Sequence, residues 1–258
     1  MFVEERHEQI LALLNENGKV KVKELSKAFE VTDDCIRKDL AAMEKKGLLK
    51  RTYGGAVSVD LGNTHPGHSN YVSSRTKMNL EKKQIIARKA VEQIKAGDII
   101  YLDTSTTNVL LAQEIVRNGL KIHVVSPMLD IANIFATESS AEFILLGGQY
   151  NLSQNSYMGM MTMKMLKNLR FDIAFMGVVG ADLENNEITT YMPEDGVMKN
   201  EVVKRANKTY LMMECEKFQF KGTYKFTDFD AVDGVICEET PEKDICEALA
   251  EHHVKIIV

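Results

Sequence analysis

Helical and strand-like segments alternate along the chain from Leu80 to its last residue, and this alternation restricts the fold more than any other feature. The strand-like segments are continuously apolar, which is typical of a sheet buried on both faces. The pattern predicts helices at 80–95, 107–117, 129–136, 196–206 and 242–251, and strands at 98–102, 120–125, 143–146, 173–176, 209–213, 235–237 and 254–258. We therefore expect an α/β domain with a largely parallel sheet and helices on both faces.

Residues 20–56 carry a second pattern, that of two short amphipathic helices joined by a tight turn. The first helix is expected at about 22–29, with an inward face formed by Val22, Leu25, Ala28 and Phe29. Thr32 is a good N-cap for the next helix. Asp33 and Asp34 fall in its first turn, where the helix dipole favours acidic groups.

The second helix of this pair is expected to end at Gly47, and its inward residues are Ile36, Leu40 and Met43. Arg37 and Lys38 lie on its other faces, where they can enter a DNA major groove. The basic run 50–55 that follows fits a small β-wing lying along a phosphate backbone. Together these features are those of a DNA-reading module.

An ordinary helical hairpin with a solvated charged face would show the same periodicity. Between Cys35 and Gly55, however, there are six basic residues and only two acidic ones. The chain beyond residue 57 has 21 basic and 27 acidic residues, a net charge of −6. A basic patch on one element beside an acidic remainder suits DNA binding through one end of the molecule, so the charge distribution favours the DNA-binding interpretation.

Several short runs make this stretch similar to the winged helix-turn-helix of the DeoR family of transcriptional regulators. They are 29–32, 35–40, 44–51 and 54–56, with Arg6 and Ile10 matching the family's first helix. Lys38 stands where the family usually has Arg, so a point charge replaces the bidentate guanidinium. The resemblance implies a double-stranded DNA operator as partner, contacted by Thr32, Cys35, Arg37, Lys38, Lys50, Arg51 and Tyr53.

The 258 residues leave room for one further domain beside such a module. We expect the DNA-binding domain at 1–57, a linker rich in Ser, Asn and Gly at 58–79, and the second domain at 80–258. No run of about 18 apolar residues predicts a membrane span, and the N-terminus lacks the apolar core of a signal peptide. The four cysteines form no C-x-x-C pair, so we expect no metal site and a cytoplasmic location.

Ligands of open parallel sheets bind at the carboxyl ends of the strands, so the loops there are the places to look for a site. The first such loop, 103–107, reads Asp-Thr-Ser-Thr-Thr and lies between an expected strand and an expected helix. Its four hydroxyl groups and the backbone N–H groups of the helix start would hold a phosphate. A cluster of N-caps is the alternative, although capping needs one Ser or Thr rather than four. Other strand ends offer Ser126, Gly147, Gly148 and Gly177, with Lys199 and Lys217 as candidate partners of an anion.

These loops are similar to those of the DeoR effector domain. The matching runs are 102–103 with 106–107, 146–148, Ser156 with Gly159, 172–177, 195–199 and 217–218. Because such domains resemble sugar-phosphate isomerases, the resemblance implies a Rossmann-like α/β fold, a phosphorylated sugar as inducer and no cofactor. It implies effector contacts from Asp103, Thr104, Ser105, Thr106, Thr107, Ser126, Gly147, Gly148, Gly177, Lys199 and Lys217. We expect a repressor of a sugar-metabolism operon, acting as a homodimer or homotetramer because operators mirror protein symmetry.

A phosphosugar isomerase that uses the same pocket is the main alternative. The run 180–182, Gly-Ala-Asp, is similar to a run in ribose-5-phosphate isomerase, but the enzyme's lysine followed by glycines is absent from 190–195. Asp103 and Asp182 would therefore lack a catalytic partner, and we expect no enzymatic activity. An NAD-binding protein is disfavoured because no G-x-G-x-x-G follows any expected strand.

Overall fold

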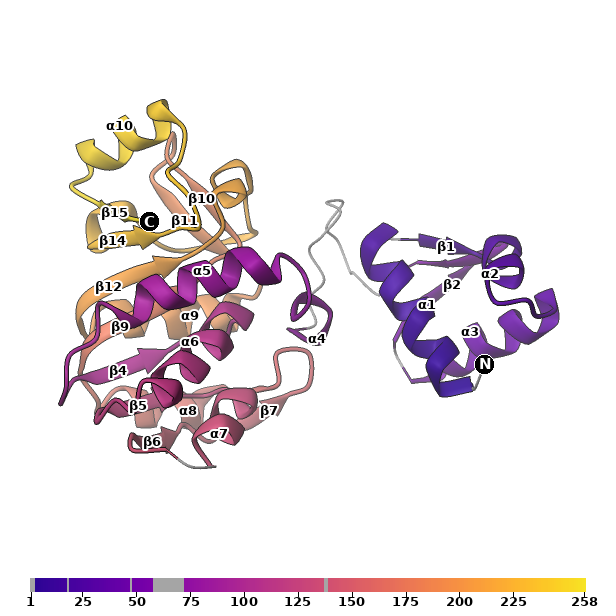
Figure 1. Cartoon of the computed structure of the whole chain (residues 1–258), viewed down its shortest axis with the longest axis horizontal. Coiled ribbons are helices and arrows are strands. Elements are labelled where there is room, and N and C mark those ends of the chain that lie inside the picture. Colours follow the sequence, from indigo (N-terminus) through magenta and orange to yellow (C-terminus); the bar gives the residue numbers. More distant parts are fainter. Residues whose placement is uncertain (1–2, 18, 47, 58–71, 137–138) are drawn as a thin grey trace. The chain divides into compact units, whose positions relative to one another are not determined.

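The computed structural model describes residues 3–17, 19–46, 48–57, 72–136 and 139–258. The chain forms two compact units, Met1–Met78 and Asn79–Val258, which we refer to as the N-terminal and C-terminal units (Figure 1). Most of the expected linker at 58–79 lies outside the described residues. Its described part contains a short helix, α4 (Val72–Arg75). The domain limits expected from the sequence stay predictions.

Helices and a small antiparallel sheet form the described part of the N-terminal unit before residue 58. The elements are α1 (Val3–Asn17), β1 (Lys19–Lys21), α2 (Val22–Ala28), α3 (Asp33–Lys45), β2 (Lys50–Thr52) and β3 (Gly55–Val57). The strand order is β1-β3-β2, so β2 and β3 form the predicted wing and β1 extends it. A Cβ at Gly55 would lie 2.0 Å from the Val20 carbonyl oxygen, so the sheet needs glycine there.

The helix α3 begins where the sequence predicted, because Thr32 caps it. Thr32 has an extended backbone, and its Oγ1 accepts a hydrogen bond from Cys35 N at 3.3 Å. The inward face of α3 joins a core whose buried members include Ile10, Leu14, Leu25, Ile36, Leu40 and Met43. The prediction for Ala28 is wrong: the periodicity placed it on the inward face of α2, but it is exposed at the end of that helix.

A buried ion pair ties α1 to α3 inside this core. Arg6 Nε donates to Asp39 Oδ2 at 2.6 Å, and Arg6 Nη2 donates to Asp39 Oδ1 at 3.1 Å. Both side chains are more than nine-tenths buried, and His7 Nε2 lies 3.2 Å from the same carboxylate. The hydrogen bond to Asp39 raises the pKa of Arg6. Asp39, one of the two acidic residues between Cys35 and Gly55, is therefore neutralised by Arg6 inside the core. The outer face of α3 is accordingly more positive than the count of charged residues suggests.

Seven parallel strands form the central sheet of the C-terminal unit, which confirms the predicted α/β fold. In the order β15-β14-β12-β9-β4-β5-β6, they are β15 (Lys255–Ile257), β14 (Gly234–Ile236), β12 (Ala206–Met212), β9 (Phe171–Gly177), β4 (Ile99–Leu102), β5 (His123–Ser126) and β6 (Glu142–Leu145). The first of them in the chain, β4, lies between β5 and β9, so the connections run toward both edges of the sheet. Open α/β sheets bind their ligands at such a switch point, here the carboxyl ends of β4 and β9.

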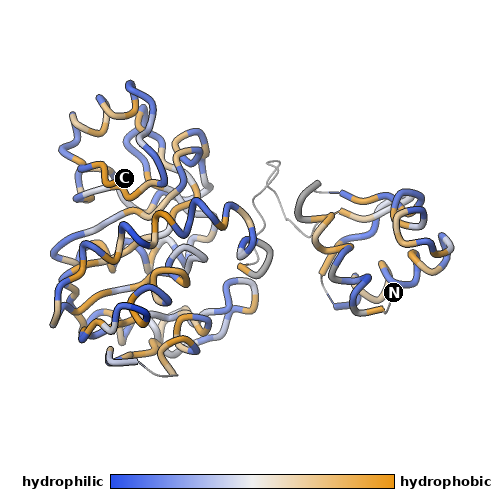
Figure 2. The backbone as a smooth tube through the Cα atoms, viewed as in Figure 1, coloured by the Kyte–Doolittle hydropathy of each residue, from blue (hydrophilic) through white to orange (hydrophobic). Residues whose placement is uncertain are grey.

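Helices cover both faces of this sheet (Figure 1). One face carries α5 (Leu80–Val91), α6 (Thr106–Arg117) and α7 (Leu129–Phe135), and the other carries α8 (Met160–Leu166) and α9 (Pro193–Val203). The last helix, α10 (Lys243–Glu251), packs against the edge strand β15. Figure 2 shows hydrophobic residues along the strands and an alternation of hydrophobic and hydrophilic residues along the helices, as a sheet buried on both faces requires. No helix in the described ranges has both the length and the apolar content needed to cross a membrane.

The sequence pattern did not predict α8 or several short elements, most of which lie at the carboxyl edge of the sheet. A hairpin of β7 (Gln149–Asn151) and β8 (Ser156–Met158) follows β6. A small antiparallel sheet contains β10 (Gly180–Asp182), β11 (Glu187–Thr190) and β13 (Tyr224–Thr227), and 3-10 turns occur at η1 (Cys215–Gln219) and η2 (Phe229–Ala231). The helix expected at 196–206 was misplaced. Pro193 starts it, because proline suits a position whose N–H has no partner within the helix.

Candidate functional site

Asp103 is the first residue after β4, and it is deeply buried at the carboxyl edge of the sheet. Its Oδ2 accepts a hydrogen bond from Gly177 N, 2.9 Å away at the end of the neighbouring strand β9. A Cβ at Gly177 would lie 2.6 Å from Ser105 Cβ, so glycine lets β9 approach the loop 103–107 this closely. Two strand ends that are 74 residues apart in the chain therefore meet at the switch point.

Lys199 reaches the same point from α9. Its Nζ donates hydrogen bonds to Asp103 Oδ2 and to the Gly177 carbonyl oxygen (2.9 Å), with Asp195 Oδ2 at 3.6 Å. The side chains of Lys199 and Asp103 are at most 4% exposed, so the ammonium is surrounded by protein oxygens rather than water. Two carboxylates compensate this one positive charge, and Lys199 thus holds α9 to the strand ends. Its expected contact with an anionic effector stays a prediction.

The loop 103–107 forms the N-terminal end of α6. Ser105 is the N-cap, and its Oγ accepts a hydrogen bond from Asn108 N at 3.1 Å. Asn108 Nδ2 donates to the carbonyl oxygens of Asp103 (3.1 Å) and Phe175 (2.9 Å), which fixes the loop to β9. Capping therefore accounts for one of the four hydroxyl groups. The remaining three, on Thr104, Thr106 and Thr107, lie beside the N–H groups at the start of a 12-residue helix, where anions are favoured.

Two further loops selected from the sequence lie at the same edge. Ser126 ends β5 and is fully buried, and its Oγ accepts a hydrogen bond from Met128 N at 3.2 Å. The Gly147 carbonyl accepts a hydrogen bond from Thr162 Oγ1 at 2.9 Å. A Cβ at Gly148, whose φ is +156°, would lie 2.1 Å from Thr162 Oγ1. Ser126 and Gly147 thus have hydrogen-bond partners within the protein, and Gly148 lies close to Thr162. The expected effector contacts of Ser126, Gly147 and Gly148 stay predictions.

Lys217 lies on η1, the turn after β12. Its Nζ donates to the Val178 carbonyl oxygen at 3.0 Å, one residue beyond Gly177, and lies 4.0 Å from Glu214 Oε2. The structure therefore brings Asp103, Ser105, Gly177 and Lys199 together and places Lys217 beside them.

Asn108 and Asp195 belong to this site, although neither was among the site residues predicted from the sequence. Asn108 could have been found as a polar residue in the first turn of an otherwise apolar helix that follows a strand end. Asp195 lies within the motif 195–199 but was not singled out from it. Asn108 Oδ1 and Ser156 Oγ, in two fully buried residues, have no hydrogen-bond partner among the described atoms. Buried polar atoms without a partner are rare, and a ligand or water commonly supplies the missing bond.

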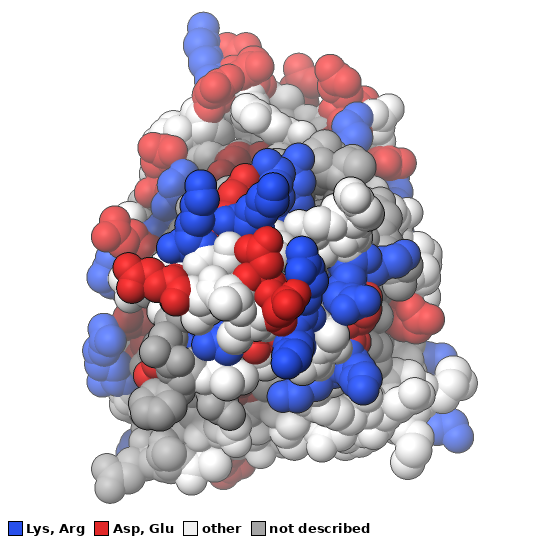
Figure 3. All heavy atoms as spheres, turned by 90° about the vertical axis from the view of Figure 1, so that its right-hand side faces the viewer, with Lys and Arg blue, Asp and Glu red and all other residues white. Residues whose placement is uncertain are grey.

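The outer face of α3 and the wing carry the residues expected to contact DNA. Arg37 is 59% exposed and forms ion pairs with Asp34 (2.7 Å) and Asp33 (3.8 Å) of its own helix. Arg51 Nε lies 3.1 Å from Glu44 Oε2, and Arg51 N donates to Glu44 Oε1 at 2.8 Å, which ties the wing to α3. Of the others, Cys35 is half-buried, and exposed positions are held by Thr32, Lys38, Lys50 and Tyr53. Figure 3 shows Lys and Arg side chains gathered on the face in view, with carboxylates between them.

Two protein-family models match this chain. The model of the DeoR-like helix-turn-helix domain matches residues 6–61, and that of the DeoR C terminal sensor domain matches residues 78–239, more than half of the chain. The chain belongs to the DeoR family. This confirms the resemblance inferred from the motifs, and the C-terminal unit is accordingly a DeoR sensor domain.

Curated DeoR-type relatives match most or all of the chain. The lactose phosphotransferase system repressor of Lactococcus lactis subsp. lactis is 34% identical over 214 residues, which are 83% of this chain and 82% of the relative. The glycerol-3-phosphate regulon repressor of Escherichia coli (strain K12) is 25% identical over 98% of this chain and 97% of the relative. The HTH-type transcriptional repressor GlcR of Bacillus subtilis (strain 168) is 27% identical over 100% of this chain and 97% of the relative. All three relatives are named as repressors rather than as enzymes.

Solved structures resemble this DeoR-family chain only distantly. Ribose 5-phosphate isomerase A from Methanocaldococcus jannaschii is 17% identical, with 54% of each chain covered and a TM-score of 0.40. The delta subunit of eIF2B from Chaetomium thermophilum is 13% identical, with 64% of this chain and 58% of the other covered and a TM-score of 0.46.

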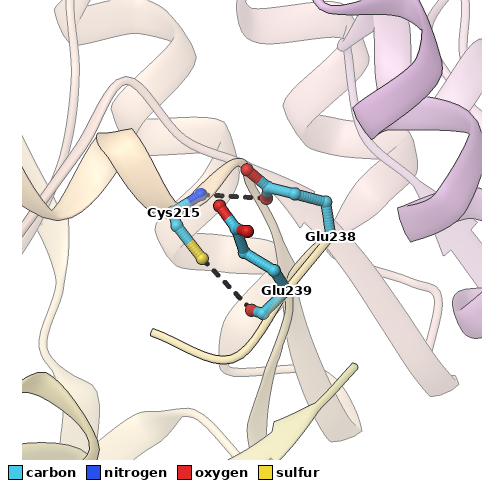
Figure 4. A group of neighbouring side chains, drawn as sticks. All are labelled: Cys215, Glu238 and Glu239. Atoms are coloured by element: carbon cyan, nitrogen blue, oxygen red, sulfur yellow. Dashed lines mark hydrogen bonds between the residues drawn. The ribbon is translucent and has the colours of Figure 1, made fainter. Parts of the chain in front are cut away.

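Cys215, Glu238 and Glu239 form a separate group of potential metal ligands in the DeoR sensor domain, with ligand atoms within 4.8 Å of one another (Figure 4). Cys215 N donates to Glu238 Oε2 at 3.0 Å, and Cys215 Sγ donates to the Glu239 carbonyl oxygen at 3.2 Å. Burial raises the pKa of the Cys215 thiol, and the neighbouring Glu238 raises it further. These contacts hold η1 against the end of β14, and the expectation of no metal site stays a prediction.

Proposed function

We propose that this protein represses a sugar-metabolism operon, and that a phosphorylated sugar bound in its sensor domain releases it from DNA. The operator would be bound by α3 and the wing. The observation that carries the proposal is the meeting of the loop 103–107 with Gly177 at the switch point of the sheet, in a chain that also has a winged helix-turn-helix. The effector would bind at this edge, where α6 begins.

A phosphate group fits this edge better than a neutral hydroxyl group does. The first turn of α6 provides backbone N–H groups without intrahelical partners, and Lys217 adds a positive charge beside Gly177. Asn108 Oδ1 and Ser156 Oγ, which have no hydrogen-bond partner among the described atoms, would form hydrogen bonds with hydroxyl groups of a sugar. The names of two relatives, a glycerol-3-phosphate regulon repressor and a lactose phosphotransferase system repressor, support a phosphorylated ligand.

We propose no catalytic role for the two carboxylates that suggested an isomerase. Asp103 is already engaged by Lys199 and by Gly177 N. Asp182 lies 2.6 Å from Lys221 Nζ and accepts a hydrogen bond from Asn185 Nδ2 at 2.7 Å. Although burial has the largest influence and raises the pKa of Asp182, Lys221 and Asn185 together lower it below its usual value. A carboxylate stabilised in its ionised form is a weak proton acceptor.

A phosphorylated sugar should raise the melting temperature of the protein and release it from DNA, whereas the parent sugar should do neither. The panel is glycerol 3-phosphate, glucose 6-phosphate, fructose 6-phosphate and ribose 5-phosphate, each beside its unphosphorylated parent. A ligand at 100 times its Kd stabilises the folded state by about 2.7 kcal/mol, which a thermal-shift assay detects. Release is measured by fluorescence anisotropy on an operator selected by the protein from random duplexes. A response to the parent sugars alone, or conversion of ribose 5-phosphate to ribulose 5-phosphate, would contradict the proposal.

Two substitutions separate base readout from backbone contact. Arg37→Ala should weaken binding to the selected operator by about 1–3 kcal/mol and reduce discrimination against a scrambled duplex. Lys50→Ala should weaken both duplexes about equally and lower the slope of log K against log salt by about one unit. Anisotropy titrations over a salt series measure both effects, with Lys27→Ala on the exposed end of α2 as the control. Normal operator binding by a folded Arg37→Ala variant would mean that the recognition helix is assigned wrongly.

We propose that the protein acts as a homodimer or homotetramer in the cytoplasm. A single winged module binds weakly, and operators mirror the symmetry of the proteins that bind them. The sensor domain also exposes large apolar side chains: Leu152 after β7 and Met160 and Met161 on α8 are each more than 70% exposed. Surfaces of this kind commonly contact another subunit.

A further inference from the structure

The sensor domain begins at the N-terminal end of α5, directly after the boundary between Met78 and Asn79. The chain that leads to the DNA-binding unit leaves the sensor domain at this point. Three residues here are each held by a carboxylate from a distant part of the domain. The pairs are Asn79 Nδ2 to Glu216 Oε1 (3.0 Å), Lys82 Nζ to Glu238 Oε1 (2.8 Å) and Lys83 Nζ to Glu214 Oε1 (3.8 Å).

Glu214 differs from the other two carboxylates because it lies between two lysines. Its Oε1 faces Lys83 of α5, and its Oε2 lies 4.0 Å from Lys217 Nζ of η1. The side chains of Glu214 and Lys83 are 5% and 7% exposed, so their charges depend on each other rather than on water. Burial, the largest influence, raises the pKa of Glu214, but Lys217 and then Lys83 outweigh it and lower the pKa below its usual value. One buried, ionised carboxylate therefore contacts both the first turn of the sensor domain and the candidate effector edge.

Lys217 provides the link to that edge. Its Nζ also donates to the Val178 carbonyl oxygen, and the preceding residue, Gly177, donates its N–H to Asp103. A dianionic phosphate bound at the start of α6 would attract Lys217 more strongly than a neutral ligand would, in competition with Glu214.

We propose that Lys217, Glu214 and Lys83 form a relay that carries effector occupancy from the carboxyl edge of the sheet to the start of α5. The relay rests on the proposed function, since it requires an anionic effector at that edge. When the phosphate draws Lys217 away from Glu214, Lys83 is the one of the two lysines that still pairs with this carboxylate. The interaction between Glu214 and Lys83 then becomes stronger. The first turn of α5 is then held differently in the two states. A ligand that distinguishes two states in this way can shift the population between them.

Lys83→Met should separate effector binding from the response to it. The substitution removes the charge at the α5 end of the relay, keeps an apolar side chain of similar length, and leaves Lys217 in place. The variant should bind the effector within about twofold of the wild type, while the effector-induced loss of operator affinity falls by about tenfold, a change within the usual range of allosteric coupling. The probe is the panel sugar phosphate that most raises the wild-type melting temperature. Its binding is measured by isothermal calorimetry, and DNA release is measured by anisotropy.

Lys82→Met is the matched control, because Lys82 is the neighbouring lysine and its ion-pair partner is Glu238 instead of Glu214. It should respond to the effector as the wild type does. Glu214→Gln keeps the size of the side chain but removes its charge, so it should reproduce the uncoupling even if Lys83→Met is poorly folded.

The outcomes distinguish the relay from the function on which it rests. Normal release by folded Lys83→Met and Glu214→Gln variants, or equal uncoupling in Lys82→Met, overturns the relay and leaves the proposed function intact. Failure of every sugar phosphate to bind the wild type overturns the proposed function and the relay with it.

Discussion

Asp39→Ala is expected to leave the N-terminal unit unfolded in most molecules while the sensor domain stays folded. The substitution leaves the Arg6 guanidinium buried without its carboxylate, and removal of one partner from a buried ion pair costs about 3–5 kcal/mol. A single core in a domain below about 70 residues rarely supplies more than about 3–5 kcal/mol, so the loss is comparable to the whole stability of the module. Operator binding should be lost and sugar-phosphate binding kept. Calorimetry of the full chain measures the two unfolding transitions, and anisotropy measures DNA binding.

Asp34→Ala is the control for this result, because Asp34 is 81% exposed and pairs with Arg37 at the surface. Surface pairs contribute about 0–1 kcal/mol, so this variant should melt almost as the wild type does. The double variant Arg6→Met and Asp39→Met should recover much of the lost stability, since apolar residues often replace a buried ion pair without loss. Equal melting of Asp39→Ala and Asp34→Ala would show that the buried pair is not what holds α1 to α3.

Lys199→Met is expected to produce a protein that binds its operator but no longer responds to the sugar phosphate. The substitution leaves Asp103, at 2% exposure, without its ammonium partner at the point where β4, β9 and α9 meet. The uncompensated carboxylate should destabilise the sensor domain by about 3–5 kcal/mol and repel an anionic ligand nearby. The residues expected to contact DNA lie in the other compact unit, so operator binding without effector should persist. Operator titrations with and without ligand, together with calorimetry, measure these effects.

Lys204→Met provides the matched control, because Lys204 is the exposed C-cap of the same helix. It should leave both stability and response unchanged. Adding Asp103→Asn to Lys199→Met should restore part of the stability, since the buried group is then neutral. If the Lys199→Met variant melts at the wild-type temperature and is released from the operator at the wild-type ligand concentration, the contacts of Lys199 with Asp103 and Gly177 have no role in the response to the effector.

The sequence was sufficient for features that depend on neighbours within a few residues. The cap at Thr32, the inward face of α3 and the apolar strands of the parallel sheet were all predicted, because capping and periodicity are local properties. The loop 103–107 could be placed at a strand end for the same reason. Family motifs in both units then identified the DeoR family, which the family models confirmed.

Other features were decided only by tertiary structure. Arg6 and Asp39 are 33 residues apart, and Lys199 and Asp103 are 96 apart, so no local pattern pairs them. A charged residue in a sequence is most simply read as solvated, and only the packing of helices and strand ends shows that these four are buried. The same limit applies to the pair of Glu214 and Lys83, which come from distant parts of the chain, whereas Lys217 is only three residues from Glu214. Local sequence thus determined most of the longer helices and strands. The packing between distant elements decided which charges are buried together, because burial forces each such charge to find a partner.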